Sequence, residues 1–252
     1  MRPVLSAITF LTIIPFPFKA REEDLKKASA FFPLVGALEG GFFLLIFLIG
    51  RKFFDNQITA GLIIAFHYIF TGAFHADGLS DTFDAIAVRG DRERKLAIMK
   101  DRTAGPVGVT AIAVSILLKY VALISVMAKW FPNVFIFLFP VAARWAMAAA
   151  MFRGRPARNE GLGHLIVSST GLSSFLTATG ILFLCWAGTF FFYGNTLWLL
   201  PALMGVYLFA VLFAIICKWN FGGLTGDNAG AVSELSEIVF LILGPLCLRY
   251  FL

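Results

Sequence analysis

The chain has 252 residues, of which 59 % are hydrophobic and only 14 % are charged. Soluble domains carry about 45–50 % apolar and about 25 % charged residues, so the composition excludes an ordinary soluble domain and a disordered chain. The net charge of +6 does not require a nucleic-acid partner, because anionic lipid head groups account for it. We expect one all-α membrane domain over residues 1–252, a polytopic helical bundle whose partner is the lipid bilayer.

The N-terminal stretch, residues 2–14, is apolar and is followed by Pro15 and Pro17. We interpret it as a helix on the membrane surface, because thirteen residues are short for crossing about 30 Å of hydrocarbon. A first membrane span is the alternative. No small-residue cleavage site follows the apolar part, so we expect no signal peptide.

Seven later stretches are long and apolar enough to be transmembrane helices. They cover residues 31–50, 57–75, 105–127, 131–151, 172–193, 196–216 and 230–248. Four longer polar segments separate them, at 15–30, 76–104, 152–171 and 217–229.

The distribution of basic residues predicts how these spans are oriented. With the N-terminus inside, the inner segments carry fifteen lysines and arginines: Arg2, Lys19, Arg21, Lys26, Lys27, Arg89, Arg92, Arg94, Lys95, Lys100, Arg102, Arg153, Arg155, Arg158 and Lys218. The outer segments carry four: Arg51, Lys52, Lys129 and Arg249. This bias predicts a cytoplasmic N-terminus. All four long polar segments then fall on the cytoplasmic side of a plasma (inner) membrane, where we expect the active site.

The densest set of candidate functional residues follows the second span, in the sequence FHADGLSDTFDA at 74–85. Asp77, Asp81 and Asp84 have the i, i+4, i+7 spacing that places three carboxylates on one helix face. Such a face favours a cation, and oxygen ligands suit Mg²⁺, Mn²⁺ or Ca²⁺. Helix capping is the alternative for Asp77 and Asp81, but it explains Asp84 poorly.

Two neighbours of this cluster have more than one interpretation. His75 is a candidate general base or phosphate donor, or a histidine at the membrane interface. Asp101, in the sequence KDRTAGP at 100–106, is either a further metal ligand or a helix cap.

Two further polar segments combine glycine turns with charged residues. At 152–171, Arg158 is followed by Glu160 in a glycine-containing turn, a combination suited to phosphate, although basic loops are also common beside membranes. At 221–237, Gly222 and Gly223 precede Asp227 in a tight turn whose amides are able to cradle an anion.

Charged residues inside apolar stretches indicate a binding site or an internal partner, because isolated charges are costly in a membrane. Lys119 and Arg144 lie well within two spans. They neutralise substrate phosphate, pair with carboxylates such as Glu234, or snorkel toward the ends of their spans, from which both lie roughly two or more turns away. Glu39 lies among small residues that permit close helix packing, and it is a candidate partner for these bases.

Carboxylates for a metal, arginines and glycine turns for phosphate, and a membrane location together suggest phosphoryl or phosphodiester transfer. The chain also resembles the cobalamin synthase family, the adenosylcobinamide-GDP ribazoletransferases. The matching elements are FLTIIPFP at 10–17, FFPLVG at 31–36, FHADGLSDTFDA at 74–85, MKDRTAG at 99–105, Arg144, ARNEGLG at 157–163 and FGGLTGDNAGAVSELSE at 221–237.

The resemblance implies a Mg²⁺-dependent enzyme that joins adenosylcobinamide-GDP to α-ribazole or its 5′-phosphate, with release of GMP. In this interpretation the metal ligands are Asp77, Asp81, Asp84 and Asp101. His75 and Asp227 are the catalytic candidates. The candidate substrate contacts are Lys119, Arg144, Arg158, Glu160, Gly222 and Gly223. The oligomeric state stays open, a homo-oligomer included.

Two other functions are alternatives. A CDP-alcohol-type membrane phosphotransferase has a different signature, because its DG pair is followed by AR, whereas Leu79 and Ser80 follow Asp77 and Gly78 here. An ion-coupled transporter would also keep charges in its spans, but it would not need aspartates and glycine turns on one side only.

Overall fold

The computed structural model describes residues 1–17, 19–101, 103–129 and 131–251. Arg102, one of the basic residues of the predicted inner side, lies outside them. The described residues form α-helices and short 3₁₀ turns without a β-strand; an isolated bridge joins Pro156 to Leu224. The expected all-α architecture is therefore confirmed.

Among the described residues, six helices are long and apolar enough to cross a membrane, and a bent pair of helices supplies a seventh candidate. The six are α3 (Phe32–Phe53, after a 3₁₀ turn at Ala28–Phe31), α7 (Pro106–Met127), α8 (Pro132–Arg153), α10 (Leu172–Tyr193), α11 (Leu200–Phe221, after a 3₁₀ turn at Leu197–Leu199) and α12 (Gly226–Phe251). The bent pair is α4 (Asn56–Thr71) with α5 (Phe74–Ala87). The shorter helices are α1 (Arg2–Leu11), α2 (Glu22–Leu25), α6 (Arg92–Ile98) and α9 (Leu162–Ser169).

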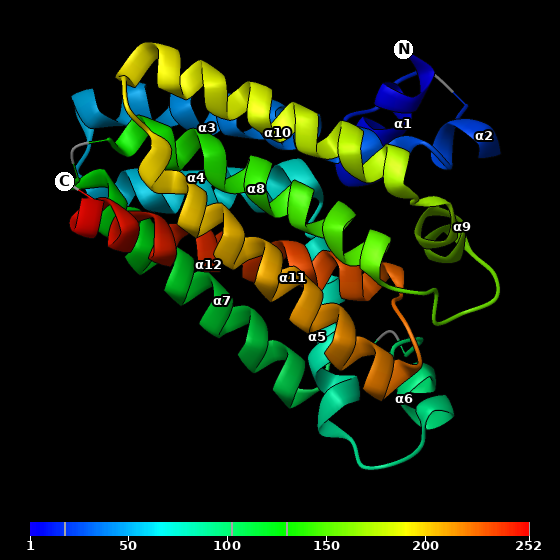
Figure 1. Cartoon of the computed structure of the whole chain (residues 1–252). Helices are drawn as coiled ribbons and strands as arrows, with labels where there is room; N and C mark the ends of the chain where they lie inside the picture. The colour runs from blue at the N-terminus through cyan, green and yellow to red at the C-terminus, as the bar shows by residue number, and fades with distance from the viewer. Residues whose placement is uncertain (18, 102, 130, 252) are drawn as a thin grey trace.

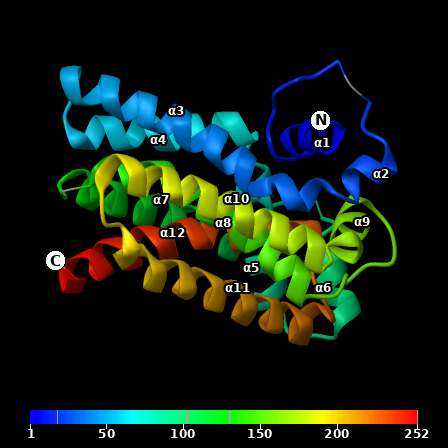
Figure 2. The ribbon, with the colours of Figure 1, turned by 45° about the horizontal axis from the view of Figure 1, so that its top comes forward.

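The N-terminal helix α1 has ten residues. At 1.5 Å per residue it is about 15 Å long, too short to cross a bilayer. It buries Ser6, Ala7 and Leu11, and it lies at the end of the bundle where α3 begins (Figure 2).

Helix α8 forms the centre of the bundle, because 94 % of its apolar window is buried. Helix α3 packs closely against it at two glycines. A Cβ atom on Gly36 would lie 2.5 Å from the Pro140 carbonyl oxygen, and one on Gly40 would overlap the Phe137 carbonyl. Because Gly36 and Gly40 have no side chains, α3 lies close to α8, and Glu39 is brought near α8 as well.

The predicted span 57–75 is wrong at its end. The helix stops at Thr71, and Gly72 and Ala73 both adopt left-handed backbone conformations, with φ of 62° and 56°. The chain then continues as α5, which is turned by 87° from α4. His75 consequently belongs to the same helix as the three aspartates.

The polar connections and the short helices α2, α6 and α9 gather at one end of the bundle (Figures 1 and 2). We call this the loop end. It also contains the starts of α7 and α12, whereas the C-terminus lies at the opposite end. The structure thus confirms that the four polar segments lie at the same end of the bundle.

Candidate active site

The acidic face of α5 lies between the first turns of α7 and α12. Gly78 touches the backbone of Asp227 at the start of α12, since a Cβ atom there would lie 2.5 Å from the Asp227 carbonyl oxygen. Gly108 in α7 approaches Ser80 and Asp84 just as closely. Because Asp77, Asp81 and Asp84 share one side of α5, these two contacts place them beside two helix N-termini.

Asp84 holds the start of α7. The backbone N–H of Gly105 donates to Oδ2 at 2.7 Å, and the N–H of Gly108 donates to Oδ1 at 2.8 Å. The carboxylate thereby satisfies two amides that the helix itself leaves without acceptors, and it interacts favourably with the helix dipole. The i, i+4, i+7 spacing of the aspartates did not predict this structural role of Asp84.

The start of α12 is held by Thr225 and Asn228. The Thr225 N–H donates to the Asn228 side-chain oxygen at 2.9 Å, and the Asn228 N–H donates to the Thr225 hydroxyl at 3.1 Å. The Asn228 amide also donates to Thr82 of α5 at 3.0 Å. This reciprocal cap ties α12 to the acidic helix. Asn228 was not among the predicted site residues, although the four-residue T-x-x-N spacing was the available signal.

Asp227 extends the acidic face and adds a basic partner. Its Oδ2 lies 3.7 Å from Nη2 of Arg158, and the two side chains are 30 % and 29 % exposed. Nε and Nη2 of Arg158 lack a hydrogen-bond partner within the described part of the chain. These two nitrogen atoms are buried although the side chain as a whole is partly exposed, and a guanidinium with unpaired donors is suited to bind an anion.

The resulting site is strongly acidic. Asp81 interacts electrostatically with the carboxylates of Asp77, Asp84 and Asp227, and with Arg158. Clustered carboxylates of this kind fit a hard divalent cation that keeps several waters and takes other ligands from substrate phosphate. Asp77, Asp81 and Asp227 are the remaining candidates to hold it, since both Asp84 oxygens already accept amides.

Asp101 lies beside this site. It lines a cavity of about 340 Å³ together with Asp81 and Asp84. Its Oδ1 accepts the N–H and hydroxyl of Thr103, at 3.1 and 2.9 Å. The structure therefore brings Asp101 to the acidic cavity and also uses it in a local turn.

His75 does not join the aspartates. Each residue rotates an α-helix by about 100°, so His75 lies roughly 160° from the acidic face of α5. Its backbone packs against Gly230 of α12, its side chain is buried, and its Nε2 has no hydrogen-bond partner among the described residues. This placement argues against His75 as the base that acts at the aspartates.

Lys119 and Arg144 are buried in the bundle and paired with carboxylates. The Lys119 ammonium lies 2.6 Å from both Glu234 and Glu237 of α12. The Arg144 guanidinium donates to Glu39 at 2.9 Å and also to Ser233. The structure thus realises the second predicted alternative, internal pairing, and does not bring these two residues to the acidic face.

His67 of α4 completes this buried ionic cluster. Its Nδ1 lies 2.7 Å from Glu39, and its Nε2 lies 3.0 Å from Glu234. With a doubly protonated imidazole, the cluster holds three carboxylates against three cations. One ligand atom each from His67, Glu234 and Glu237 lies within 4.8 Å of the others, the spacing of a metal site, but the Lys119 ammonium already binds both glutamates. We infer that the cluster has a structural role and holds α3, α4, α7, α8 and α12 together.

Gly222 and Gly223 serve backbone packing. Gly222 ends α11 with φ of 74° and lies beneath the Arg92 side chain. Gly223 leaves room for the Arg155 carbonyl, where the Leu224 N–H donates to Arg155 at 2.6 Å. The structure therefore gives both glycines protein contacts, and their assignment to substrate stays a prediction.

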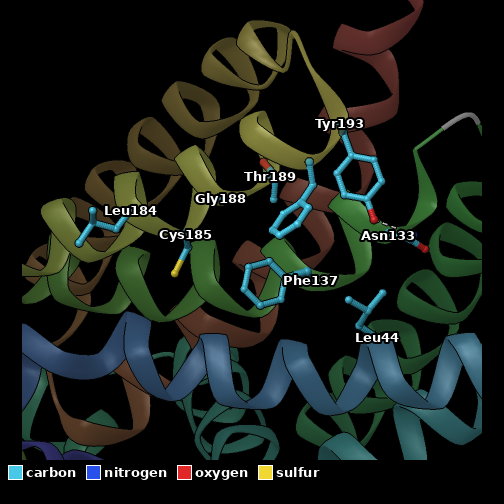
Figure 3. A pocket seen from close by; sticks show the side chains of 9 residues that line it. Leu44, Asn133, Phe137, Leu184, Cys185, Gly188, Thr189 and Tyr193 are labelled. Atoms are coloured by element: carbon cyan, nitrogen blue, oxygen red, sulfur yellow. Dashed lines mark hydrogen bonds between the residues drawn. The ribbon is translucent and has the colours of Figure 1, made fainter.

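Two other cavities differ in chemistry. At the loop end, a cavity of about 410 Å³ lies between α6 and the segment 157–160, and Arg158 and Glu160 are among its lining residues. At the opposite end, a cavity of about 440 Å³ between α3, α8 and α10 is lined mainly by apolar side chains, with the Asn133–Tyr193 hydrogen bond at one edge (Figure 3). None of the described residues that line the second cavity is charged, so it does not suit a phosphorylated ligand.

The chain is similar to a family of known proteins along nearly its whole length. Residues 3–244 match the family described as Cobalamin-5-phosphate synthase. Relatives named adenosylcobinamide-GDP ribazoletransferase include those of Geotalea daltonii, with 40 % identity over 96 % of both chains, and Acetivibrio thermocellus, with 36 % identity over 96 % of this chain and 97 % of the relative. The relative from Thermodesulfovibrio yellowstonii is 32 % identical over 94 % of both chains. No solved structure matches the chain.

Proposed function

Because the chain belongs to the cobalamin-5-phosphate synthase family, we propose that it joins adenosylcobinamide-GDP to α-ribazole and so completes adenosylcobalamin. With α-ribazole 5′-phosphate the product is the 5′-phosphate of adenosylcobalamin. The observation that carries this proposal is the acidic face of α5 with Asp227 and an unsatisfied Arg158 beside it. Phosphoryl transfer needs such positioned charges more than it needs a covalent contribution from the protein.

The reaction balances as a single displacement at phosphorus. The 3′-hydroxyl oxygen of ribazole forms a bond to the phosphorus that carries cobinamide. The bond from that phosphorus to the bridging oxygen of the diphosphate breaks, and GMP leaves with the bond's electron pair. The hydroxyl proton passes to a carboxylate and then to water.

We assign Asp77, Asp81 and Asp227 to a Mg²⁺ site, with Asp84 as their support. The bound ion would supply positive charge to the phosphate oxygens. Arg158 contributes donors to the same phosphates. Asp227 is also our candidate for accepting the proton of the ribazole 3′-hydroxyl, because His75 lies on the side of α5 away from the acidic face.

We also propose that the loop end faces the cytoplasm and that the membrane is the plasma (inner) membrane. The fifteen-to-four bias of basic residues supports this orientation. Both substrates are water-soluble, so a site at the end of the bundle is reached without crossing the bilayer.

The test is an assay of purified protein in detergent or lipid. Adenosylcobinamide-GDP and α-ribazole are supplied with Mg²⁺, or with Mg²⁺ replaced by EDTA, and mass spectrometry detects completed cobamide and GMP. We expect both products with Mg²⁺ only. Failure of folded protein to make product, while an active family member succeeds alongside, would overturn the proposed function. Equal turnover with EDTA would overturn the metal assignment alone.

A further inference from the structure

The cavity at the loop end has walls that the structure fixes in place. One wall is α6, and the other is the segment that joins α8 to α9 (Figure 1). Arg92 donates a hydrogen bond across the boundary to the Ala157 carbonyl. Lys95 holds the other side of α6 to α11 through Asn220, at 2.6 Å. The cavity is therefore largely formed before a ligand binds, as in most small-molecule sites.

The lining combines both signs of charge. Three cations, Arg92, Lys100 and Arg158, share the cavity with the carboxylates of Glu93 and Glu160. A site for phosphate alone gains nothing from carboxylates, because they repel the anion. A ligand that carries phosphate at one end and a neutral group rich in N–H donors at the other satisfies both kinds of side chain.

Guanine has this donor pattern. Its N1–H and 2-amino group lie side by side on one edge, and the two oxygens of a carboxylate accept both. Adenine offers an acceptor at N1 and is not matched. Hypoxanthine keeps N1–H but lacks the 2-amino donor, so it matches only in part.

Arg158 connects this cavity to the acidic face, since it lines the cavity and also lies 3.7 Å from Asp227. We propose that the cavity binds the guanosine monophosphate half of adenosylcobinamide-GDP, with the guanine edge on Glu93 or Glu160 and its phosphate on Arg158. The reacting phosphorus then lies toward the aspartates and cobinamide extends away from the cavity. This inference rests on the proposed function, and it adds where the leaving group lies and why it is a guanine nucleotide.

The test compares nucleotides on purified full-length protein in detergent. Binding of GMP, IMP and AMP is measured by calorimetry for the wild type, Glu93→Gln, Glu160→Gln and the control Glu23→Gln, whose exposed carboxylate lies on α2. We expect the wild type to bind GMP at least tenfold more tightly than IMP or AMP. One of the two cavity variants should lose most of that preference, and Glu23→Gln should retain it.

A turnover assay distinguishes failure of the cavity assignment from failure of the proposed function. All four proteins are assayed for cobamide formation with adenosylcobinamide-GDP and with its inosine analogue, and kcat/KM is compared. If the wild type makes cobamide but Glu93→Gln and Glu160→Gln both keep the wild-type preference for guanine, the cavity assignment is wrong. If the wild type makes no cobamide, the proposed function fails instead. Equal binding of GMP and AMP by the wild type would also overturn the assignment.

Discussion

Gly78 and Asp227 are in backbone contact: a Cβ atom on Gly78 would lie 2.5 Å from the Asp227 carbonyl oxygen. The two residues are far apart in sequence, and each lies beside a charged group of the proposed site. Gly78 follows Asp77, and the Asp227 side chain lies near Arg158. The distance between the aspartates of α5 and Asp227 of α12 therefore depends on the absence of a side chain at position 78.

We expect Gly78→Ala to separate α5 from the start of α12 and to lower kcat for cobamide formation at least tenfold. Overpacking of this kind costs about 1–3 kcal/mol of stability, so most of the protein should still fold. The control is Gly61→Ala in α4, where an added Cβ meets nothing within 4 Å. Thermal melting and activity are measured together. Wild-type kcat in Gly78→Ala would contradict the dependence on this contact.

Replacing Asp81 by Asn should lower kcat by about 10²-fold or more, because the change removes a charge from the proposed metal site without changing side-chain size. The melting temperature should not fall, since relieving like-charge repulsion offsets the lost carboxylate. Arg89→Gln is the control, as Arg89 is exposed at the end of α5. A Mg²⁺ titration of both variants tests the cause. If Asp81→Asn turned over like Arg89→Gln, the metal assignment would fall.

The six spans other than the bent pair were predictable because hydropathy is a local property, and each coincides with a helix in the structure. The end of α4 was not predictable in this way. The apolar pattern continues through Gly72 and Ala73, and hydropathy does not record that both residues have positive φ. The direction of His75 depends on this break and on the face of α5 that packs against α12, so sequence position alone suggested a proximity to the aspartates that the fold does not provide.

The start of α12 is a second feature that the sequence predicted only in part. The sequence placed the span at 230–248, whereas the helix begins at Gly226 and includes Asp227, Glu234 and Glu237. These polar residues are accommodated because their partners come from other parts of the fold, among them Lys119 of α7 and Arg158 of the segment that joins α8 to α9. Pairing of Lys119 with Glu234 was one of the predicted alternatives, but only tertiary structure distinguishes it from a substrate contact.

Asp84 should differ from Asp81 in its mutant phenotype. Asp84→Ala leaves the amides of Gly105 and Gly108 without their acceptor, and since both hydrogen bonds are partly buried, each loss costs at most about 1–3 kcal/mol. We expect a lower melting temperature and a loss of activity that Mg²⁺ does not restore. Asp81→Ala, measured alongside, should keep its melting temperature. The same melting temperature for both alanine variants would show that Asp84 does not hold the start of α7.

Lys119→Met should be strongly destabilising, because it leaves Glu234 and Glu237 as buried carboxylates without the ammonium that now lies 2.6 Å from each. Removing one partner of a buried ion pair costs about 3–5 kcal/mol. We expect a low yield of monodisperse protein and a melting temperature well below that of Lys129→Met, which changes an exposed lysine beyond α7. Adding Glu234→Gln to Lys119→Met should recover part of the loss, since one unpaired charge is removed. A substrate-binding role predicts the opposite pattern, with an unchanged melting temperature and a raised KM for adenosylcobinamide-GDP, and that result would refute the structural role of Lys119.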